Sequence, residues 1–307
     1  IAAELRNRGA DVDFVSASPF KSVVLKAITR LKRVWVVPFL EKYYHTKILS
    51  FGKTKYDYIF VLKGEALSEN LLISLKKKYS TATFILYLWD SLENNVSLER
   101  NIKLFDRCFS FDRFDVKKYG LNYRPLFYGD GFKREPMQQF KFALSFIGTV
   151  HSDRYSVVSR TLSMLPAHLV SYSYFFLQAP WVFYLRRLLT SAFSGAKVQD
   201  FNFLPMSKPD VQGVFKNSFA IFDIEHPLQR GLTMRSIEAL GAKKKLVTTN
   251  KSIVDEDFYN CQNIHILDRE GLLEIPADFF DVPFQSVPED IYYKYSISGW
   301  IDDIFQV

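Results

Sequence analysis

Residues 223–241 read Asp223-Ile-Glu-His-Pro-Leu-Gln-Arg-Gly-Leu-Thr-Met-Arg-Ser-Ile-Glu-Ala-Leu-Gly241. The stretch begins at the end of an apolar run, 218–223, and continues as a polar loop that contains Gly231. A helical pattern then starts near Thr233 and is closed by Gly241. A second apolar run, 245–249, follows directly. Strand, loop, helix and strand in this order predict one unit of a mostly parallel sheet.

The same alternation extends outward from this stretch over most of the chain. The predicted strands are 56–62, 83–89, 108–111, 123–127, 142–147, 168–176, 218–223, 245–249 and 264–267. The predicted helices are 67–75, 112–119, 155–165, 181–193, 234–240 and 292–305. The first nine residues are typical of the tail of a helix, and 12–15 of a strand. We therefore expect a first strand upstream of Ile1.

A short stretch rich in glycine, proline and charge, 129–136, interrupts the alternation and predicts a linker. We predict an α/β protein with two Rossmann-like domains facing a cleft. The first covers 1–130, the second covers 131–290, and a C-terminal helix, 291–307, packs back on the first. In open βα sheets the ligands bind beyond the carboxyl ends of the strands, so the site is expected in the cleft.

Composition narrows the class of protein. The chain has 307 residues, of which 48% are hydrophobic, and that is enough for two packed cores. Two cysteines cannot build a disulfide framework or a cysteine-rich metal site. The sequence contains no run of eighteen apolar residues and no signal peptide pattern. We expect a cytoplasmic protein.

Positive charge is concentrated near the start of the chain. Residues 1–56 hold eleven Lys and Arg against four Asp and Glu, which leaves +7, the net charge of the whole chain. Within them, 20–49 resembles a basic amphipathic helix interrupted near Pro38. Such a surface suits the anionic headgroups of a membrane, and it would equally attract a phosphorylated substrate or nucleic acid. A solvated helix face with its apolar side in the core explains the pattern as well.

The loop and helix after 218–223 form the strongest candidate site. Thr233 is placed to cap the helix, whose N–H groups and dipole suit a diphosphate. Arg235 adds a guanidinium for phosphate, and Glu238, one turn on, can accept two hydrogen bonds from a ribose. The competing interpretation is a plain capped helix with a glutamate on its exposed face.

This region resembles the nucleotide-sugar motif of GT-B glycosyltransferases. The matching residues are Gly231, Glu238, Ala239, Gly241 and the strand Leu246-Val-Thr-Thr249. With Phe146-Ile-Gly148, Arg154 and Arg235-x-x-Glu238, the C-terminal half is similar to spore-maturation-type and surface-polysaccharide transferases. The resemblance implies that Glu238 binds the donor ribose. Many retaining members carry a second Glu eight residues earlier, where this chain has Arg230; that leaves the stereochemistry open, and Arg230 could bind donor phosphate or a sugar carboxylate.

Sugar transfer by inversion needs a base for the acceptor hydroxyl. Asp90, at the end of 83–89, is the first candidate, and Glu65, after 56–62, is the second. An N-cap role for Asp90 explains its position equally well. Gly148 would let the backbone approach a ligand and Arg154 would hold phosphate, although a simple turn and a surface ion pair are the alternatives.

Two further patterns have plain interpretations. Asp11-Val-Asp13 has the form of a metal-binding pair, but alternation along a strand puts both carboxylates on one exposed face, so we expect no metal. We expect no cofactor either, since the nucleotide-sugar implied by the resemblance is a substrate. The aromatic runs 172–176 and 181–187 could contact a membrane, but we favour a buried strand and a core helix with its basic residues outside.

The sequence thus predicts a glycosyltransferase that takes a nucleotide-sugar donor. Its expected acceptor is a glycan, carried on a lipid, in bacterial surface polysaccharide assembly. The basic residues 20–50 would contact the inner membrane face, and no nucleic acid is expected as a partner. A nucleotide-sugar epimerase of the same fold and a non-catalytic module for phosphorylated ligands are the alternatives.

Overall fold

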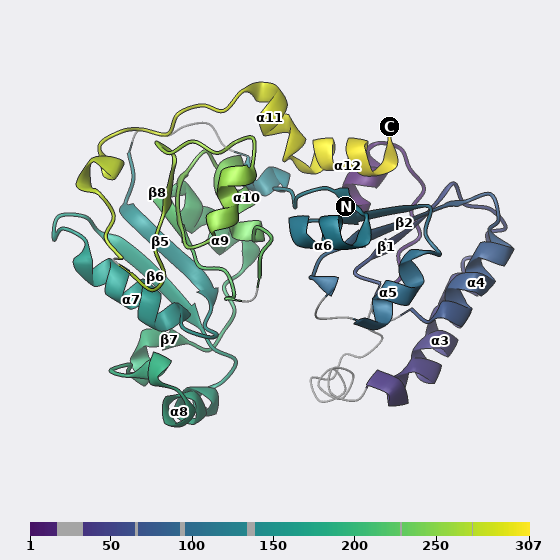
Figure 1. Cartoon of the computed structure of the whole chain (residues 1–307), viewed down its shortest axis with the longest axis horizontal. Helices are drawn as coiled ribbons and strands as arrows, with labels where there is room; N and C mark the ends of the chain where they lie inside the picture. Colours follow the sequence, from purple (N-terminus) through teal and green to yellow (C-terminus); the bar gives the residue numbers. More distant parts are fainter. Residues whose placement is uncertain (17–32, 65–66, 93–95, 134–138, 228, 272) are drawn as a thin grey trace. The chain divides into compact units, whose positions relative to one another are not determined.

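The computed structural model describes the chain except for residues 17–32, 65–66, 93–95, 134–138, 228 and 272 (Figure 1). The chain divides into two compact units. The first comprises Ile1–Pro125 together with Ile304–Val307, and the second comprises Leu126–Asp303. The sequence had placed this boundary after residue 130.

The first unit is built on a parallel sheet. Within the described residues its strand order is β1 (Tyr58–Leu62), β2 (Thr83–Leu88), β3 (Arg107–Ser110) and β4 (Asn122–Tyr123). Its helices are α1 (Ala2–Asn7), α3 (Arg33–Leu49), α4 (Glu69–Lys78), α5 (Val96–Ile102) and α6 (Arg113–Tyr119). The central strand β2 is buried along almost its whole length because helices cover both faces of a parallel sheet.

Local signals set the helix ends of this unit. Ser68 caps α4 by accepting a hydrogen bond from the Leu71 N–H, and Asp112 caps α6 in the same way. Gly120 ends α6 in the left-handed conformation, at φ 66°, which costs glycine nothing. Side-chain caps therefore fix where α4 and α6 begin, and a glycine fixes where α6 ends.

Three expectations for the first unit were wrong. Residues 12–15 form no strand. Asp11 and Asp13 both pair with the Lys53 ammonium, so ion pairs hold this segment in place of the backbone hydrogen bonds of a strand. The helix α3 runs through Pro38 without interruption, and the remainder of the expected basic helix, 20–32, lies outside the described residues. The strand expected over 123–127 is reduced to β4.

The second unit carries a larger parallel sheet. Its strand order over the described residues is β10 (Ile264–Ile266), β9 (Lys245–Thr248), β8 (Ser218–Asp223), β5 (Phe142–Thr149), β6 (Ser171–Phe176) and β7 (Phe201–Asn202). Its helices are α7 (Arg154–Met164), α8 (Pro180–Leu189), α9 (Lys208–Lys216), α10 (Met234–Gly241), α11 (Glu289–Lys294) and α12 (Ile297–Phe305), whose last residues belong to the first unit. Short 3-10 turns lie at Asp130–Phe132, Ser191–Phe193, Val198–Asp200, Lys251–Asp255 and Ala277–Phe280.

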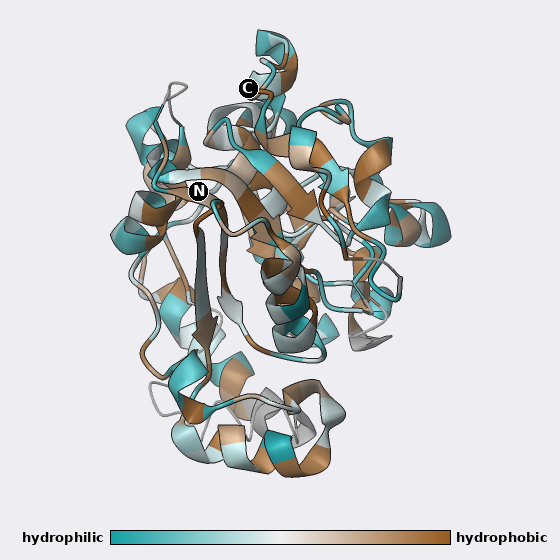
Figure 2. Cartoon of the chain, turned by 90° about the vertical axis from the view of Figure 1, so that its left-hand side faces the viewer, coloured by the Kyte–Doolittle hydropathy of each residue, from teal (hydrophilic) through white to brown (hydrophobic). Residues whose placement is uncertain are grey.

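The core of this unit is apolar and rich in aromatic rings. Phe146 and Phe222 lie on adjacent central strands and are almost fully buried. Phe193 and Phe201 stack at 5.4 Å between ring centres, and both rings contact Phe183 of α8. Figure 2, which faces this unit, shows brown and teal alternating along its helices, as expected when one face of each helix is buried.

Two predictions for this unit need correction. The helix expected over 181–193 ends at Leu189, and its apolar side chains do not all enter the core: Phe183 is buried, whereas Trp181 and Leu188 are exposed. The C-terminal helix is two helices, α11 and α12, because Tyr295 and Ser296 break the helical run. Within the described residues no helix is both long and apolar enough to cross a bilayer.

Candidate functional site

The loops after four strands of the second sheet meet at its carboxyl edge. Strand β8 ends at Asp223 and pairs in register with Thr248 at the end of β9. The exit of β5 lies on the other side of β8, and that of β10 lies beyond β9. This edge is where ligands bind in open parallel sheets.

Helix α10 is fixed to the end of β8 at its first turn. The Thr233 hydroxyl accepts hydrogen bonds from the N–H groups of Arg235 and Ser236, so it caps the helix as predicted. It also donates to Asp223 Oδ2 at 2.6 Å, and the Ser236 hydroxyl donates to the same oxygen at 2.7 Å. The buried Asp223 carboxylate therefore sets the position of the helix start.

Arg235 and Glu238 lie one turn apart on α10 and form an ion pair of 2.9 Å between Nη1 and Oε2. The guanidinium also lies over the Phe215 ring of α9. Burial raises the pKa of the Glu238 carboxyl, and the charge of Arg235 opposes that rise. The structure thus brings together the two residues predicted to hold phosphate and ribose.

In this structure Arg154 binds backbone carbonyls, and Gly148 allows close packing of the backbone. The Arg154 side chain donates from Nε to the Ile224 carbonyl at 2.6 Å and from Nη1 to the Thr149 carbonyl at 3.0 Å. It therefore ties the exit of β5 to the exit of β8. A Cβ at Gly148 would lie 2.9 Å from the Phe146 ring, so close packing already requires glycine there.

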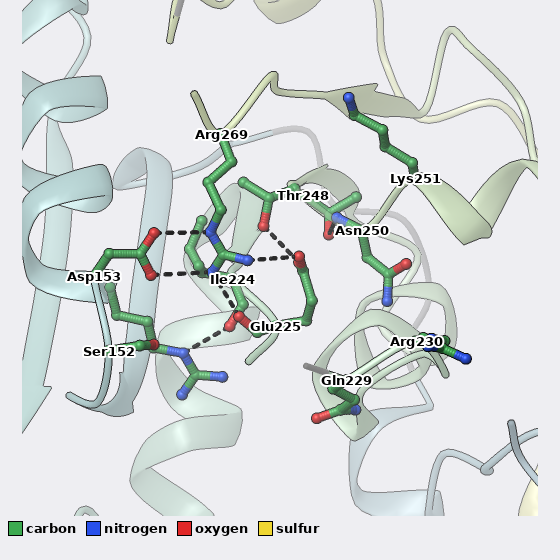
Figure 3. A network of polar contacts seen from close by, with 12 residues as sticks. Ser152, Asp153, Ile224, Glu225, Gln229, Arg230, Thr248, Asn250, Lys251 and Arg269 are labelled. Atoms are coloured by element: carbon green, nitrogen blue, oxygen red, sulfur yellow. Dashed lines mark hydrogen bonds and ion pairs between the residues drawn. The ribbon is translucent and has the colours of Figure 1, made fainter. Parts of the chain in front are cut away.

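A guanidinium that the sequence analysis missed joins three of the loops (Figure 3). Arg269, after β10, donates from Nε to Asp153 at 2.9 Å, from Nη1 to Glu225 Oε1 at 2.9 Å and from Nη2 to the Glu225 carbonyl at 2.7 Å. Thr249 donates to the other carboxylate oxygen of Glu225. Burial raises the pKa of Glu225, against the opposing effects of Thr249 and Arg269. The rule that singled out the other strand exits would have found Arg269 had it been applied to the last strand.

The loop that carries Gly231 is hydrogen-bonded to residues that follow β9. The Gly231 carbonyl accepts from the Asn250 side chain at 3.2 Å, and the Arg230 carbonyl accepts from the Ser252 hydroxyl at 2.7 Å. The Arg230 side chain is exposed and points away from Arg269 in Figure 3. This loop thus presents Arg230 to solvent beside α10.

His151 and His226 lie together at the same edge, with ring centres 5.0 Å apart. Burial lowers the pKa of His151 to about 4, and the nearby positive charge of Arg154 adds to the effect. His151 is therefore a neutral ring near neutral pH, and it can accept or donate a hydrogen bond without carrying charge.

In the first unit, Asp90 follows β2 and pairs with the Lys63 ammonium at 2.5 Å. Both side chains are about half exposed, so solvent screens the pair. The loop that follows Asp90 is bound to α6, because the buried Asp115 carboxylate accepts a hydrogen bond from the Leu92 N–H at 2.8 Å. Glu65, the second candidate base, lies outside the described residues.

The described residues contain no cluster of three or more His, Cys, Asp or Glu side chains in a metal-binding arrangement. A groove of about 610 Å³ opens elsewhere in the second unit, beside α9. It is lined by residues of β5, β6, the loop before α9 and α9 itself, including Phe142, Tyr172 and Asp210, and by no residue of the predicted donor site.

No protein-family model and no curated protein matches the chain by sequence. Solved structures match its fold. OtsA in its apo form aligns with 88% of this chain and 77% of its own at 11% identity and a TM-score of 0.58. A glycosyltransferase from Rickettsia africae aligns with 99% and 86%, at 13% identity and 0.57. Anabaena HepE, solved with UDP and glucose, aligns with 87% and 74%, at 12% identity and 0.50.

The chain has the GT-B fold. Its two parallel sheets confirm the predicted fold class of two Rossmann-like domains. In this chain the candidate site of Thr233, Arg235 and Glu238 lies at the six-stranded sheet of the second unit.

Proposed function

We propose that the chain is a glycosyltransferase that transfers a sugar from a nucleotide-sugar donor to a glycan acceptor. The observation that carries the proposal is the capped start of α10 at the carboxyl edge of the second sheet, with the Arg235–Glu238 pair one turn inside it. The GT-B fold supports it, as does the complex of the similarly folded Anabaena HepE with UDP and glucose.

The donor roles follow from the chemistry of the edge. The N–H groups at the start of α10 favour the negative charge of a diphosphate, and Arg235 and Arg230 add cations beside it. The Glu238 carboxylate accepts hydrogen bonds from the ribose hydroxyls. Gly148, Arg154 and Gly231 act by fixing the loops around the donor.

The acceptor is bound by the first unit in this proposal. Asp90, or Glu65 in its place, takes the proton of the acceptor hydroxyl while that oxygen attacks the anomeric carbon of the sugar. The bond from this carbon to the donor phosphate breaks, and the nucleotide diphosphate leaves with the electron pair. The pair between Lys63 and Asp90 is about half exposed and screened by solvent, so an incoming acceptor can displace the Lys63 ammonium.

The same proposal places the enzyme in bacterial surface polysaccharide assembly, at the cytoplasmic face of the inner membrane. The concentration of positive charge in residues 1–56 suits an acceptor carried on a lipid diphosphate. Residues 20–50 would make this contact. The first part of this stretch, 20–32, lies outside the described residues.

The first test is calorimetric titration of the full chain with UDP, GDP, CMP and their sugar conjugates. We expect one nucleotide to bind, and Glu238→Ala to weaken its binding by at least about tenfold, since a hydrogen-bond acceptor for two hydroxyls is lost. Glu274→Ala, an exposed glutamate of the same unit, is the matched control and should bind like the wild type.

Two results would contradict the donor site. One is equal binding by the wild type and Glu238→Ala, which would place the nucleotide elsewhere. The other is no binding of any nucleotide by the folded chain, which would favour the alternative that the protein is a non-catalytic module for phosphorylated ligands.

A further inference from the structure

Helix α8 exposes a continuous apolar face. The exposed fractions are 66% for Trp181, 59% for Tyr184, 46% for Leu185, 83% for Leu188 and 69% for Leu189. These positions follow the spacing of three and four residues that puts side chains on one side of a helix. The helix lies at the lower edge of the second unit in Figure 1.

The opposite face of α8 is anchored in the unit. Phe183 is buried and its ring lies 5.2 Å from that of Phe201. The Arg186 guanidinium donates from Nη1 to the Val150 carbonyl at 2.6 Å and so ties the helix to the exit of β5. The helix is therefore held in place with its second apolar face turned outward.

Such a face is unusual on a helix that already has a buried side. Exposed large apolar residues scattered singly need no explanation, but a contiguous patch of them marks an interaction surface. Here five large side chains within nine residues share the outer face. We therefore infer that this patch binds a partner.

The chemistry of the helix indicates which occupant fits. Its ten residues include Arg186 and Arg187 and no Asp or Glu. Trp and Tyr at the start of the face are the side chains that favour the boundary between headgroups and acyl chains, and the leucines at its end favour the acyl chains. Arg187, whose side chain is exposed, favours anionic headgroups, whereas Arg186 is bound to the Val150 carbonyl.

We propose that α8 docks on an anionic lipid surface, with its apolar face inserted at the level of the headgroups and Arg187 among them. This docking surface belongs to the second unit and includes none of residues 20–50. It does not depend on the transferase activity, because binding to a vesicle needs neither donor nor acceptor.

Co-sedimentation of the full chain with vesicles tests this. One set of vesicles contains phosphatidylcholine alone, and the other contains phosphatidylcholine with phosphatidylglycerol. We expect the wild type to bind the anionic vesicles, and the double variant Leu188→Gln/Leu189→Gln to bind them at least about tenfold more weakly, because two exposed leucines no longer insert. Arg187→Glu should weaken binding most at low salt, where headgroup attraction is least screened.

Ile73→Gln is the matched control, because Ile73 is an exposed aliphatic residue on helix α4 of the first unit. It should bind like the wild type. Circular dichroism and thermal unfolding establish that all variants are folded.

Three outcomes overturn the proposal. The first is vesicle binding by Leu188→Gln/Leu189→Gln at the wild-type level, which would move the lipid contact to another part of the chain. The second is no binding of the wild type to either kind of vesicle. The third is a dimer in light scattering that the double variant abolishes, which would make the face a contact between two copies.

Discussion

At the scale of single residues, two arginines brace the candidate site. Arg154 was expected to hold donor phosphate, yet its guanidinium already donates to the carbonyls of Thr149 and Ile224. Arg269 similarly joins Asp153 to Glu225. In the proposed function both are positioning residues, which fix the loops on which Thr233, Arg235 and Glu238 depend.

His151 gives this edge a measurable pH dependence. The folded state holds its pKa at about 4, below the ordinary 6.5, through burial and the charge of Arg154. As pH falls from 6.5 to 4, the unfolded chain takes up a proton that the folded chain does not, so stability decreases over this range. His151→Gln should remove about 1–2 kcal/mol of this decrease, a value reduced because the ring is only half buried.

Urea unfolding at a series of pH values measures the effect. The control is His168→Gln, because His168 is an exposed histidine of the same unit. Its curve of stability against pH should follow the wild type. An unchanged slope in His151→Gln would show that the ring is charged in the folded state.

At the scale of elements, α10 shows how the same residue can be predicted for one reason and required for another. The sequence indicated Gly241 as a helix stop. In the structure Gly241 is the last helical residue, and the left-handed conformation falls on Lys243, at φ 51°. Glycine is required at 241 because a Cβ there would lie 2.3–2.7 Å from atoms of the buried Tyr128.

Gly241→Ala should therefore destabilise the second unit by about 1–3 kcal/mol, the usual cost of overpacking a closed core. Gly213→Ala is the matched control, because Gly213 lies in helix α9 with open space where its Cβ would stand. It should stabilise by about 0.5–1 kcal/mol through helix propensity alone. Equal effects of the two variants on urea unfolding would rule out the contact with Tyr128.

At the scale of the whole molecule, the sequence predicted the elements better than the contacts between them. Buried strands such as β2 and β8 consist mostly of apolar residues, so their runs were recognisable in the sequence. Strand β7, of two residues, gives no such signal, and α9 was missed because its Pro and Gly obscure the helical pattern. The bond between Arg269 and Asp153 joins residues 116 apart, and only the order of strands in the sheet brings them together.

The C-terminal helix α12 contributes to both units, and this makes their separate stabilities testable. Phe305 packs its ring against Tyr58 and Phe60 of the first unit, whereas Trp300 packs against Phe127 of the second. Phe305→Ala should destabilise the first unit by roughly 3–5 kcal/mol, because a buried ring is replaced by a cavity. Hydrogen exchange should then speed up in β1 and β2 and stay unchanged in β8 and β9.

Trp300→Ala should show the reverse pattern, since its ring is fully buried in the second unit. Val307→Ala, at an exposed position of the same chain end, should change neither unit. Faster exchange in both sheets after either core substitution would mean that the two units unfold as one cooperative body. In that case α12 would couple their stabilities, and a ligand bound to the second unit would protect the first as well.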